Sequence, residues 1–388
     1  MSKYFENDVN KFIDPKCIEN FFDRMWPLMR SITGKGYRKT HKIISEIVPL
    51  KKISFKTGEK VFDWEIPHEW IYNDAYVIDP TGKKILESKR NNLHLVNYSK
   101  PINKKISFEK FKKKLYFLKE RPDSIPYITS YYKRDWGFCT TYKEFKKMIK
   151  GNYEVFIDTK FKKGELFVSE AYLPGSLKKE IFFSSYTCHP SMANNELSGP
   201  LINMFLYNYL SIKKDRKYSY RFLFSAETIG TIAYLSKMHK VLEKNLIAGY
   251  VLTCIGDENS FNYKRSREIN LLVNQAAENS LKFSTKSLKN VYDYFPWGSD
   301  ERQYCSLGID LPVGCITRSM YGNYEEYHTS DDNKNIINFN SMVETVQELV
   351  NICDIIETNK IFKTVEGKCE PFLSKYGLYD TLSETRTN

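Results

Sequence analysis

Apolar residues follow two different periods along the second half of this chain. Nearly continuous apolar runs of strand length alternate with segments whose apolar positions recur at helical spacing. The runs fall at 153–161, 164–173, 180–188, 218–227, 246–257 and 311–317, and the helical segments at 198–210, 228–238, 267–283 and 339–357. Strands that are apolar on both sides must be covered on both faces. The alternation therefore predicts an α/β fold, with a mixed, largely parallel sheet flanked by helices.

The first 150 residues have a different texture. Helical spacing predicts two helices, at 16–31 and 37–48, and short strands separated by turns follow at 53–108. A helix is expected at 109–118. Another is expected to begin near Thr141, where Glu144 completes a capping box. The segment 53–108 predicts a small β-rich unit.

Composition narrows the class of protein. The 388 residues, of which 41% are hydrophobic and 15% aromatic, suffice for a sizeable packed core. The net charge of +12 comes from lysines dispersed along the chain, so we do not expect a nucleic-acid partner. No run approaches the ~20 apolar residues of a membrane helix, and no secretory signal is visible. We therefore expect no membrane partner and a cytoplasmic location.

The eight cysteines are scattered and none forms a CxxC pair. In a long chain without a secretory signal, this pattern favours free thiols over disulfides. It gives a zinc finger no support.

Polar residues gather where the predicted strands end. His189 follows the run at 180–188, Glu227 follows 218–226, and Asp257 follows 246–255. The loops after 297 and 317 add Asp300 and His328. Ligand sites of open α/β sheets collect at the carboxyl ends of strands. Imidazole and carboxylate groups bind Zn²⁺, and an unligated Glu takes a proton from bound water, so this inventory is that of a zinc hydrolase.

Each of these residues alone has a simpler explanation. A lone histidine at a strand end is more often a hydrogen-bonded structural residue than a ligand. A glutamate at a strand-to-helix junction is often a favourable charge at a helix N-terminus. The joint pattern favours metal chemistry more than any single residue does, and at this point a structural role stays open.

The order of the motifs resembles the zinc-dependent exopeptidase family of bacterial leucine aminopeptidase. The motifs are "TCHPSMANNELSGP", "AETIG", "GSDERQYCSLGIDLP" and "EYHTSDDN". "VFDWEIPHEW" and "NNLHLVNYS" resemble the start and end of a small β-domain that is inserted in a bacterial aminopeptidase-like subgroup. The resemblance covers nearly the whole chain. It implies a zinc-exopeptidase-like catalytic domain at 1–58 and 120–388, and an inserted β-rich domain at 59–119. A C-terminal winged-helix unit, common in the subgroup, is expected to be missing.

The resemblance also assigns roles to single residues. It implies that His189, Asp257 and His328 are metal ligands and that Glu227 is the catalytic general base. Asn195 stands where relatives have the Asp that bridges two metal ions, and we expect it to be a weak ligand.

Thr228, Asp300 and Tyr327 are expected to contact the substrate. Thr228 also stands where relatives place another carboxylate ligand.

Two departures from the family pattern bear on the metal count. The neutral carbonyl oxygen of Asn195 cannot balance the charge of two dications, and the hydroxyl of Thr228 is a poor zinc ligand. We therefore expect zinc as the cofactor, with one ion rather than two. His328 either binds this ion or contacts the substrate.

Three functions follow from these expectations. The first is an aminopeptidase-like metallopeptidase that hydrolyses a small peptide or an amide-bearing small molecule. The alternative is a catalytically degenerate relative that binds a sugar or amino-sugar ligand in surface-polysaccharide biosynthesis. The third is an interaction protein that uses the β-rich insert or the basic surface. The oligomeric state is left open, a homo-oligomer included.

Overall fold

The computed structural model describes residues 9–360 and 367–378. The chain divides into two units, Met1–Glu357 and Thr358–Asn388. The second unit contains the short helix η5 (Leu373–Tyr376), which ends at Gly377 with a φ of 67°. All predicted site residues belong to the first unit. No helix of the described residues has the length and apolar character needed to cross a lipid bilayer.

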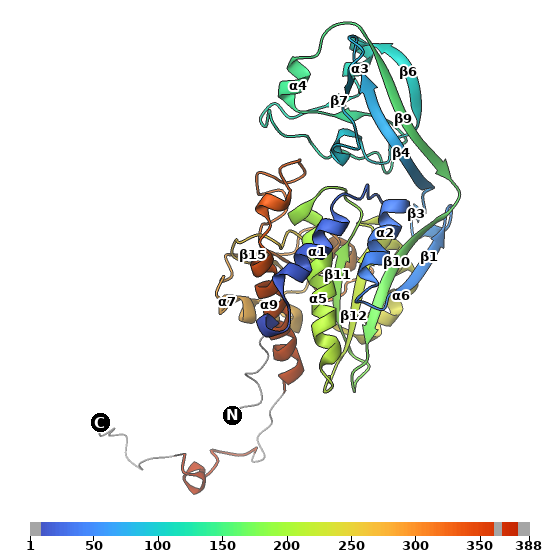
Figure 1. The fold of residues 1–388 in the computed structure, drawn as a ribbon. Coiled ribbons are helices and arrows are strands. Elements are labelled where there is room, and N and C mark those ends of the chain that lie inside the picture. The colour runs from blue at the N-terminus through green and yellow to red at the C-terminus, as the bar shows by residue number, and fades with distance from the viewer. Residues whose placement is uncertain (1–8, 361–366, 379–388) are drawn as a thin grey trace. The chain divides into compact units, whose positions relative to one another are not determined.

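An eight-stranded mixed sheet forms the centre of the first unit, as far as the described residues go (Figure 1). Its four middle strands are parallel, whereas β1 and β10 on one side and β14 on the other run antiparallel to their inner neighbours. The spatial order is β1 (Lys51–Lys56), β10 (Glu165–Leu173), β12 (Ser219–Ser225), β11 (Glu180–Tyr186), β13 (Leu246–Leu252), β16 (Val313–Thr317), β14 (Asn262–Lys264) and β15 (Asn290–Tyr292). The predicted α/β fold class is confirmed.

Side chains of the central strand β11 point alternately into two apolar layers. Ile181 and Phe183 pack into one layer, and Phe182 packs into the other. This period of two explains why the strand reads as one continuous apolar run. The first layer is closed by α1 (Pro15–Met25), α5 (Ser198–Ile212), α7 (Leu272–Lys282) and α9 (Phe339–Thr358). The second is closed by α6 (Ile229–Asn245) and α8 (Glu301–Tyr304), and α2 (Lys35–Ile44) contributes to both.

A second sheet, four-stranded and antiparallel, is also formed by described residues. Its order is β5 (Lys84–Ile85), β4 (Glu69–Ile78), β9 (Asn152–Lys162) and β6 (Ile102–Ser107). In β9 every second residue is buried, among them Tyr153, Val155 and Ile157, so one face of the strand completes this sheet's core. β9 lies beyond the range 59–119 given for the insert. The domain limits themselves stay a prediction.

The predicted helix at 109–118 is wrong beyond its first turn. Helix α3 (Phe108–Lys112) is short, and β7 (Leu115–Tyr116) follows it and pairs in parallel with β8 (Phe138–Cys139). Phe111 and Leu115 have helical spacing, yet both are buried in the same apolar layer as Phe138. Pairing with a distant strand buries Leu115 without a helix, and local spacing does not reveal this.

Two helix boundaries have local causes, the early end of the helix predicted at 16–31 and the predicted start near Thr141. Helix α1 ends at Met25, two residues before Pro27, whose ring and missing N–H disfavour a longer helix. Helix α4 (Tyr142–Lys146) begins at the predicted capping box, in which the N–H of Glu144 donates to Thr141 Oγ1 at 3.0 Å. The remaining short elements are η1 (Val9–Lys11), β2 (Lys60–Val61), β3 (Trp64–Glu65), η2 (Asn92–His94), η3 (Ala193–Leu197) and η4 (Lys334–Ile336).

The turn η3, a π-helical turn that leads directly into α5, places the asparagines of the "NNELSG" motif. Gly199 allows this placement, because a Cβ there would lie 2.2 Å from the carbonyl oxygen of Leu252 at the end of β13. Only glycine lets the first turn of α5 sit so close to the sheet. The η3 turn is thereby held near the carboxyl ends of the central strands.

Candidate active site

His189 lies just beyond the carboxyl end of β11, as the sequence predicts. Its side chain is almost fully buried. The rings of Tyr127 and Tyr186 pack edge-on against the imidazole, with centroids 4.9 Å and 5.3 Å away. These contacts leave the imidazole little freedom to rotate, so its two nitrogens face fixed neighbours.

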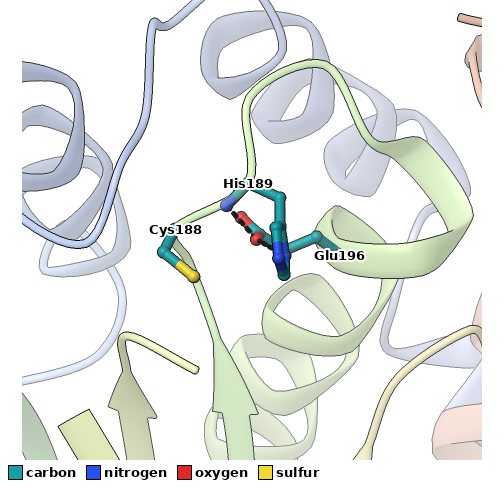
Figure 2. Close-up of side chains that lie close together, drawn as sticks. All are labelled: Cys188, His189 and Glu196. Atoms are coloured by element: carbon teal, nitrogen blue, oxygen red, sulfur yellow. Dashed lines mark hydrogen bonds and ion pairs between the residues drawn. The ribbon is translucent and has the colours of Figure 1, made fainter. Parts of the chain in front are cut away.

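Glu196, which sequence reasoning missed, lies beside the Nδ1 edge of the imidazole. Nδ1 of His189 lies 2.6 Å from Glu196 Oε2, and the backbone N–H of His189 donates to the same oxygen. Figure 2 shows the two side chains facing each other, with Cys188 to one side. Glu196 is the seventh residue after His189, in the motif "NNELSG". Its place in that polar turn was the signal available, but the resemblance directed attention to Asn195.

Glu196 is in turn held by Arg30, a second residue that sequence reasoning missed. Arg30 Nε lies 3.2 Å from Glu196 Oε1, and the guanidinium also donates to the carbonyl oxygens of His189 and Met25. Arg30 and Glu196 are both fully buried. No sequence pattern links these two residues, which are 166 positions apart. The buried pair fixes the backbone and the ring of His189 together.

Nε2, the other nitrogen of His189, faces the predicted general base. It lies 3.4 Å from Oε2 of Glu227, which follows the neighbouring parallel strand β12. Burial lowers the pKa of His189, but the carboxylates of Glu196 and Glu227 outweigh it, so the pKa is raised overall. Burial also raises the pKa of Glu227, although His189 and Arg302 oppose this. A half-buried carboxyl group with a raised pKa suits proton transfer near neutral pH.

Thr228 lies in the turn that follows Glu227, and Asp300, from a distant loop, stabilises this turn by hydrogen bonds. Thr228 has a φ of 63°, in the left-handed region, and its N–H donates to Asp300 Oδ1 at 2.8 Å. Oδ2 of Asp300 accepts from the Thr231 hydroxyl at 2.8 Å. Burial, followed by the charge of Glu227, raises the pKa of Asp300 to about 7. Both oxygens of Asp300 thus stabilise the turn, and its predicted contact with substrate stays a prediction.

Lys264 anchors the segment that contains Asp300 and the first residues of helix α8, including Arg302. Its ammonium lies 2.8 Å from the carboxylate of Glu301 and donates to the carbonyl oxygens of Phe295 and Trp297. Both partners of the ion pair are buried. Sequence reasoning missed Lys264 as well, since it is the last residue of the short strand β14, far from the recognised motifs.

Among the described residues, Asp257 shares no cluster of three or more potential metal-binding side chains with His189. The amide oxygen of Asn195 is buried without a hydrogen-bond partner. Asp257 Oδ2 accepts from Asn194 Nδ2 at 2.6 Å, and Oδ1 accepts from the N–H of Asn259 at 2.8 Å. The carboxylate of Asp257 therefore stabilises the η3 turn and its own loop.

Asp332 fastens the η3 turn from the opposite side. Its carboxylate accepts from the backbone N–H groups of Ala193, Asn194 and Asn195, at 3.1, 2.6 and 2.9 Å. Burial raises the pKa of Asp332 to about 7 despite these bonds. The aspartate lies within the predicted "YHTSDD" segment, and its contacts position the Asn195 backbone.

His328 shares its environment with His189. The two ring centroids lie 5.8 Å apart, and Tyr127 packs edge-on against both. Tyr327 stacks on His328 with centroids 3.9 Å apart, so its structural contact is with this ring. Burial, and then the charge of His189, lower the pKa of His328 to about 3, so the imidazole is neutral at pH 7.

His328 also has an unusual backbone, with a φ of 55°. In the described part of the chain, its ring nitrogens have no hydrogen-bond partner. Left-handed backbone at a non-glycine residue is costly and often marks a functional position. A neutral imidazole without such a partner is free to bind a cation or a ligand.

Among the described residues, one group of potential metal-binding side chains has its ligand atoms within 4.8 Å of one another. It consists of Cys188, His189 and Glu196. Two of the three are poor candidates. Glu196 is already engaged by Arg30 and His189. Burial raises the pKa of the Cys188 thiol well above its ordinary value, and its sulfur accepts the N–H of Glu227 at 3.3 Å.

The side chains that remain suit one cation better than two. His189 Nε2 and His328 offer nitrogen donors of the kind that Zn²⁺ prefers, and the Glu227 carboxylate lies beside Nε2 of His189. The orphaned amide oxygen of Asn195 is a further, neutral donor. Thr228, which the sequence resemblance puts in the place of another carboxylate ligand, accepts a hydrogen bond at Oγ1 from Arg302 Nη2 at 2.9 Å. A guanidinium at that point disfavours a second cation.

The sheet order and its helical layers define an α/β protein, and its similarity to known proteins shows that it has an aminopeptidase-like domain. The chain belongs to the family described as "Domain of unknown function (DUF4910)", whose model matches residues 19–359. A Clostridium acetobutylicum protein is 42% identical over 377 residues, 96% of this chain and 86% of that protein. Its name is "Putative polysaccharide biosynthesis protein with aminopeptidase-like domain".

Solved structures agree with this assignment of the fold. The crystal structure of a putative peptidase from Clostridium acetobutylicum has a TM-score of 0.89 at 41% identity, covering 96% of this chain and 87% of that one. BSAP, a zinc aminopeptidase from Bacillus subtilis, has a TM-score of 0.63 at 11% identity, covering 88% and 96%. The second likeness concerns the fold alone. The aminopeptidase-like part of the expected resemblance is thus confirmed, whereas the subgroup and its winged helix stay predictions.

Proposed function

We propose that this protein is a metal-dependent hydrolase that cleaves an amide or peptide bond, with a single zinc ion at His189. The observation that carries the proposal is the placement of the His189 ring between two carboxylates. Nδ1 lies 2.6 Å from Glu196, and Nε2 lies 3.4 Å from Glu227. In zinc enzymes a ligating histidine is typically oriented by a carboxylate on its other nitrogen. The zinc aminopeptidase among the proteins of similar fold supports the choice of metal.

His189 Nε2 and His328 would hold the zinc ion, with Asn195 as a weak neutral ligand. Bound zinc supplies polarisation of a carbonyl oxygen and a lower pKa for bound water. Asp257 is not included in this ligand set, because its two oxygens already accept hydrogen bonds from Asn194 and Asn259. Its role as a ligand stays a prediction.

Glu227 is the proposed general base. Its carboxylate takes a proton from the attacking water, the C–N bond of the tetrahedral intermediate breaks, and the same proton passes to the leaving amine. Burial and the raised pKa of Glu227 favour the proton-bearing form that this second step needs. The charges of His189 and then of Arg302 oppose this rise in the pKa of Glu227.

Two measurements, metal content and amide hydrolysis, test this proposal, and a separate variant is designed for each. Protein purified without chelator is expected to contain about one zinc per chain by mass spectrometry of the metals. His189→Ala is expected to lose the zinc, whereas Glu227→Gln is expected to keep it and lose amide hydrolysis. Absence of stoichiometric zinc, or unchanged hydrolysis in Glu227→Gln, would contradict the proposal.

A second candidate function is ligand binding without peptidase chemistry. Asn195 and Thr228 in place of carboxylates favour it, as does the polysaccharide biosynthesis named for the Clostridium acetobutylicum relative. In this case the site would bind a sugar or amino-sugar derivative. Thermal unfolding separates the two candidates: stabilisation by such sugars, but by neither zinc nor peptides, would favour binding alone.

A further inference from the structure

A cavity of about 900 Å³ opens beside the turn that carries Glu227. Thr228 and Arg302 form the part of its wall nearest to the proposed base. The aromatic rings of Trp64, Tyr132 and Tyr294 line other parts of it. Trp64 and Tyr132 pack edge-on, with centroids 5.1 Å apart, and Tyr132 is 58% exposed. The cavity therefore offers an apolar, ring-sized surface next to the candidate catalytic groups.

The charge of this cavity is decided by its two arginines. Arg267 is neutralised by Asp310, with which it forms an ion pair through Nε at 2.8 Å and Nη2 at 2.5 Å. Arg302 has no carboxylate partner at ion-pair distance among the described residues. Its contact is the hydrogen bond from Nη2 to Thr228 Oγ1 at 2.9 Å, and its Nε is buried without a partner.

An unpaired guanidinium in a largely apolar wall favours an anionic ligand. Its fork of N–H donors matches a carboxylate in charge and geometry, whereas an ammonium group would be repelled. Glu227 and Asp300 are both close enough to Arg302 to feel its charge, but neither forms an ion pair with it among the described contacts. A carboxylate of a ligand could therefore pair with the Arg302 guanidinium at ion-pair distance.

We propose that this cavity binds an amide compound that carries a carboxylate beside an apolar ring, with Arg302 as the residue that selects the carboxylate. The inference rests on the proposed function for the place of the amide, at Glu227 and His189. The proposed substrates place a carboxylate near Arg302. Peptides that would place a free N-terminal amine there are therefore a different substrate class. The preference for an anion follows from the cavity itself, so it can be measured without catalysis.

Three matched probes test the proposal by isothermal titration calorimetry. They are N-acetyl-L-phenylalanine, the neutral N-acetyl-L-phenylalaninamide and the cationic L-phenylalaninamide. The full chain with Glu227→Gln is used, so that no probe is hydrolysed. One charge-assisted hydrogen-bond pair predicts about tenfold tighter binding of the acid than of its neutral amide. The cationic probe is expected to bind weakest.

Variants of Arg302 and Arg267 show which arginine causes the preference for the acid over its neutral amide. Arg302→Gln is expected to abolish it, Arg302→Lys to keep part of it, and Arg267→Gln to leave it within twofold. Thermal unfolding of each variant checks that the chain is folded. Equal binding of acid and amide, no detectable binding of the acid at millimolar concentration, or a preference that follows Arg267 would overturn the proposal. A preference for the acid in a protein without zinc or amide hydrolysis would leave it standing and refute the proposed function alone.

Discussion

Glu196 Oε2 lies 2.6 Å from Nδ1 of His189, on the side of the ring away from the nitrogen that faces Glu227. Nδ1 is at ion-pair distance from this carboxylate but without the geometry of a hydrogen bond, and the negative charge favours a proton on that nitrogen. The lone pair of Nε2 is then directed toward Glu227. Because Arg30 anchors Glu196, the orientation of His189 depends on two distant parts of the chain.

Glu196→Gln should weaken zinc binding by about 10- to 100-fold, the usual cost of losing a carboxylate behind a ligating histidine. The measurement is a competition titration against a chromophoric chelator. Glu243→Gln, an exposed glutamate on α6, is the matched control and should bind zinc like the wild type. Unchanged affinity in Glu196→Gln would mean that the pair with His189 is structural only.

Asn195→Asp should strengthen zinc binding by at least about tenfold, since an anionic oxygen replaces a neutral one that lacks a partner. The same substitution should lower the stability of the zinc-free protein, because it buries a charge without an established partner. Chelator competition measures the first effect, and chemical denaturation with and without zinc measures the second. Equal stability in both conditions would argue that residue 195 does not contact the metal.

Asp300→Asn should destabilise the folded chain by about 1–3 kcal/mol, because an amide has one acceptor for the two donors of Thr228 and Thr231. The wild type and the variant should be compared at pH 8, because Asp300 has a pKa of about 7 in the folded chain and is ionised at this pH. Urea denaturation gives the free energy of unfolding. Asp293→Asn, which breaks an exposed ion pair with Arg265, serves as the control and should cost less than about 1 kcal/mol.

His41 should make the protein less stable as the pH falls. Burial between Ser169 and Thr187 lowers its pKa from 6.5 to about 3, so the folded chain resists a proton that the unfolded chain accepts. Its contribution is complete above pH 6.5 and declines by up to about 1.4 kcal/mol per pH unit toward pH 3.

The measurement for His41 is the difference in unfolding free energy between the wild type and His41→Gln, from denaturant titrations between about pH 7 and 4. Glutamine does not titrate, so any advantage of the wild type should shrink as the pH falls. A difference that stays constant over this range would show that His41 is already charged, or already hydrated, in the folded protein.

Local patterns along the chain predicted most of the main sheet and the place of the first site residue. The apolar run before His189 became β11, and the capping box at Thr141 became the start of α4. These features depend on burial of alternate side chains and on hydrogen bonds between close neighbours, which periodicity and spacing record directly. The fold class and the position of His189 at a strand end were therefore determined by the sequence alone.

Contacts between distant segments were decided only by the tertiary structure. The pair of Arg30 with Glu196, the bond from Arg302 to Thr228 and the pairing of β7 with β8 join residues whose local spacing says nothing of their partners. Burial and electrostatics act through space, so the charge at the cavity wall and the orientation of His189 emerge only when the chain is folded. The sequence supplied the candidate ligands, and packing determined which of their atoms remain free.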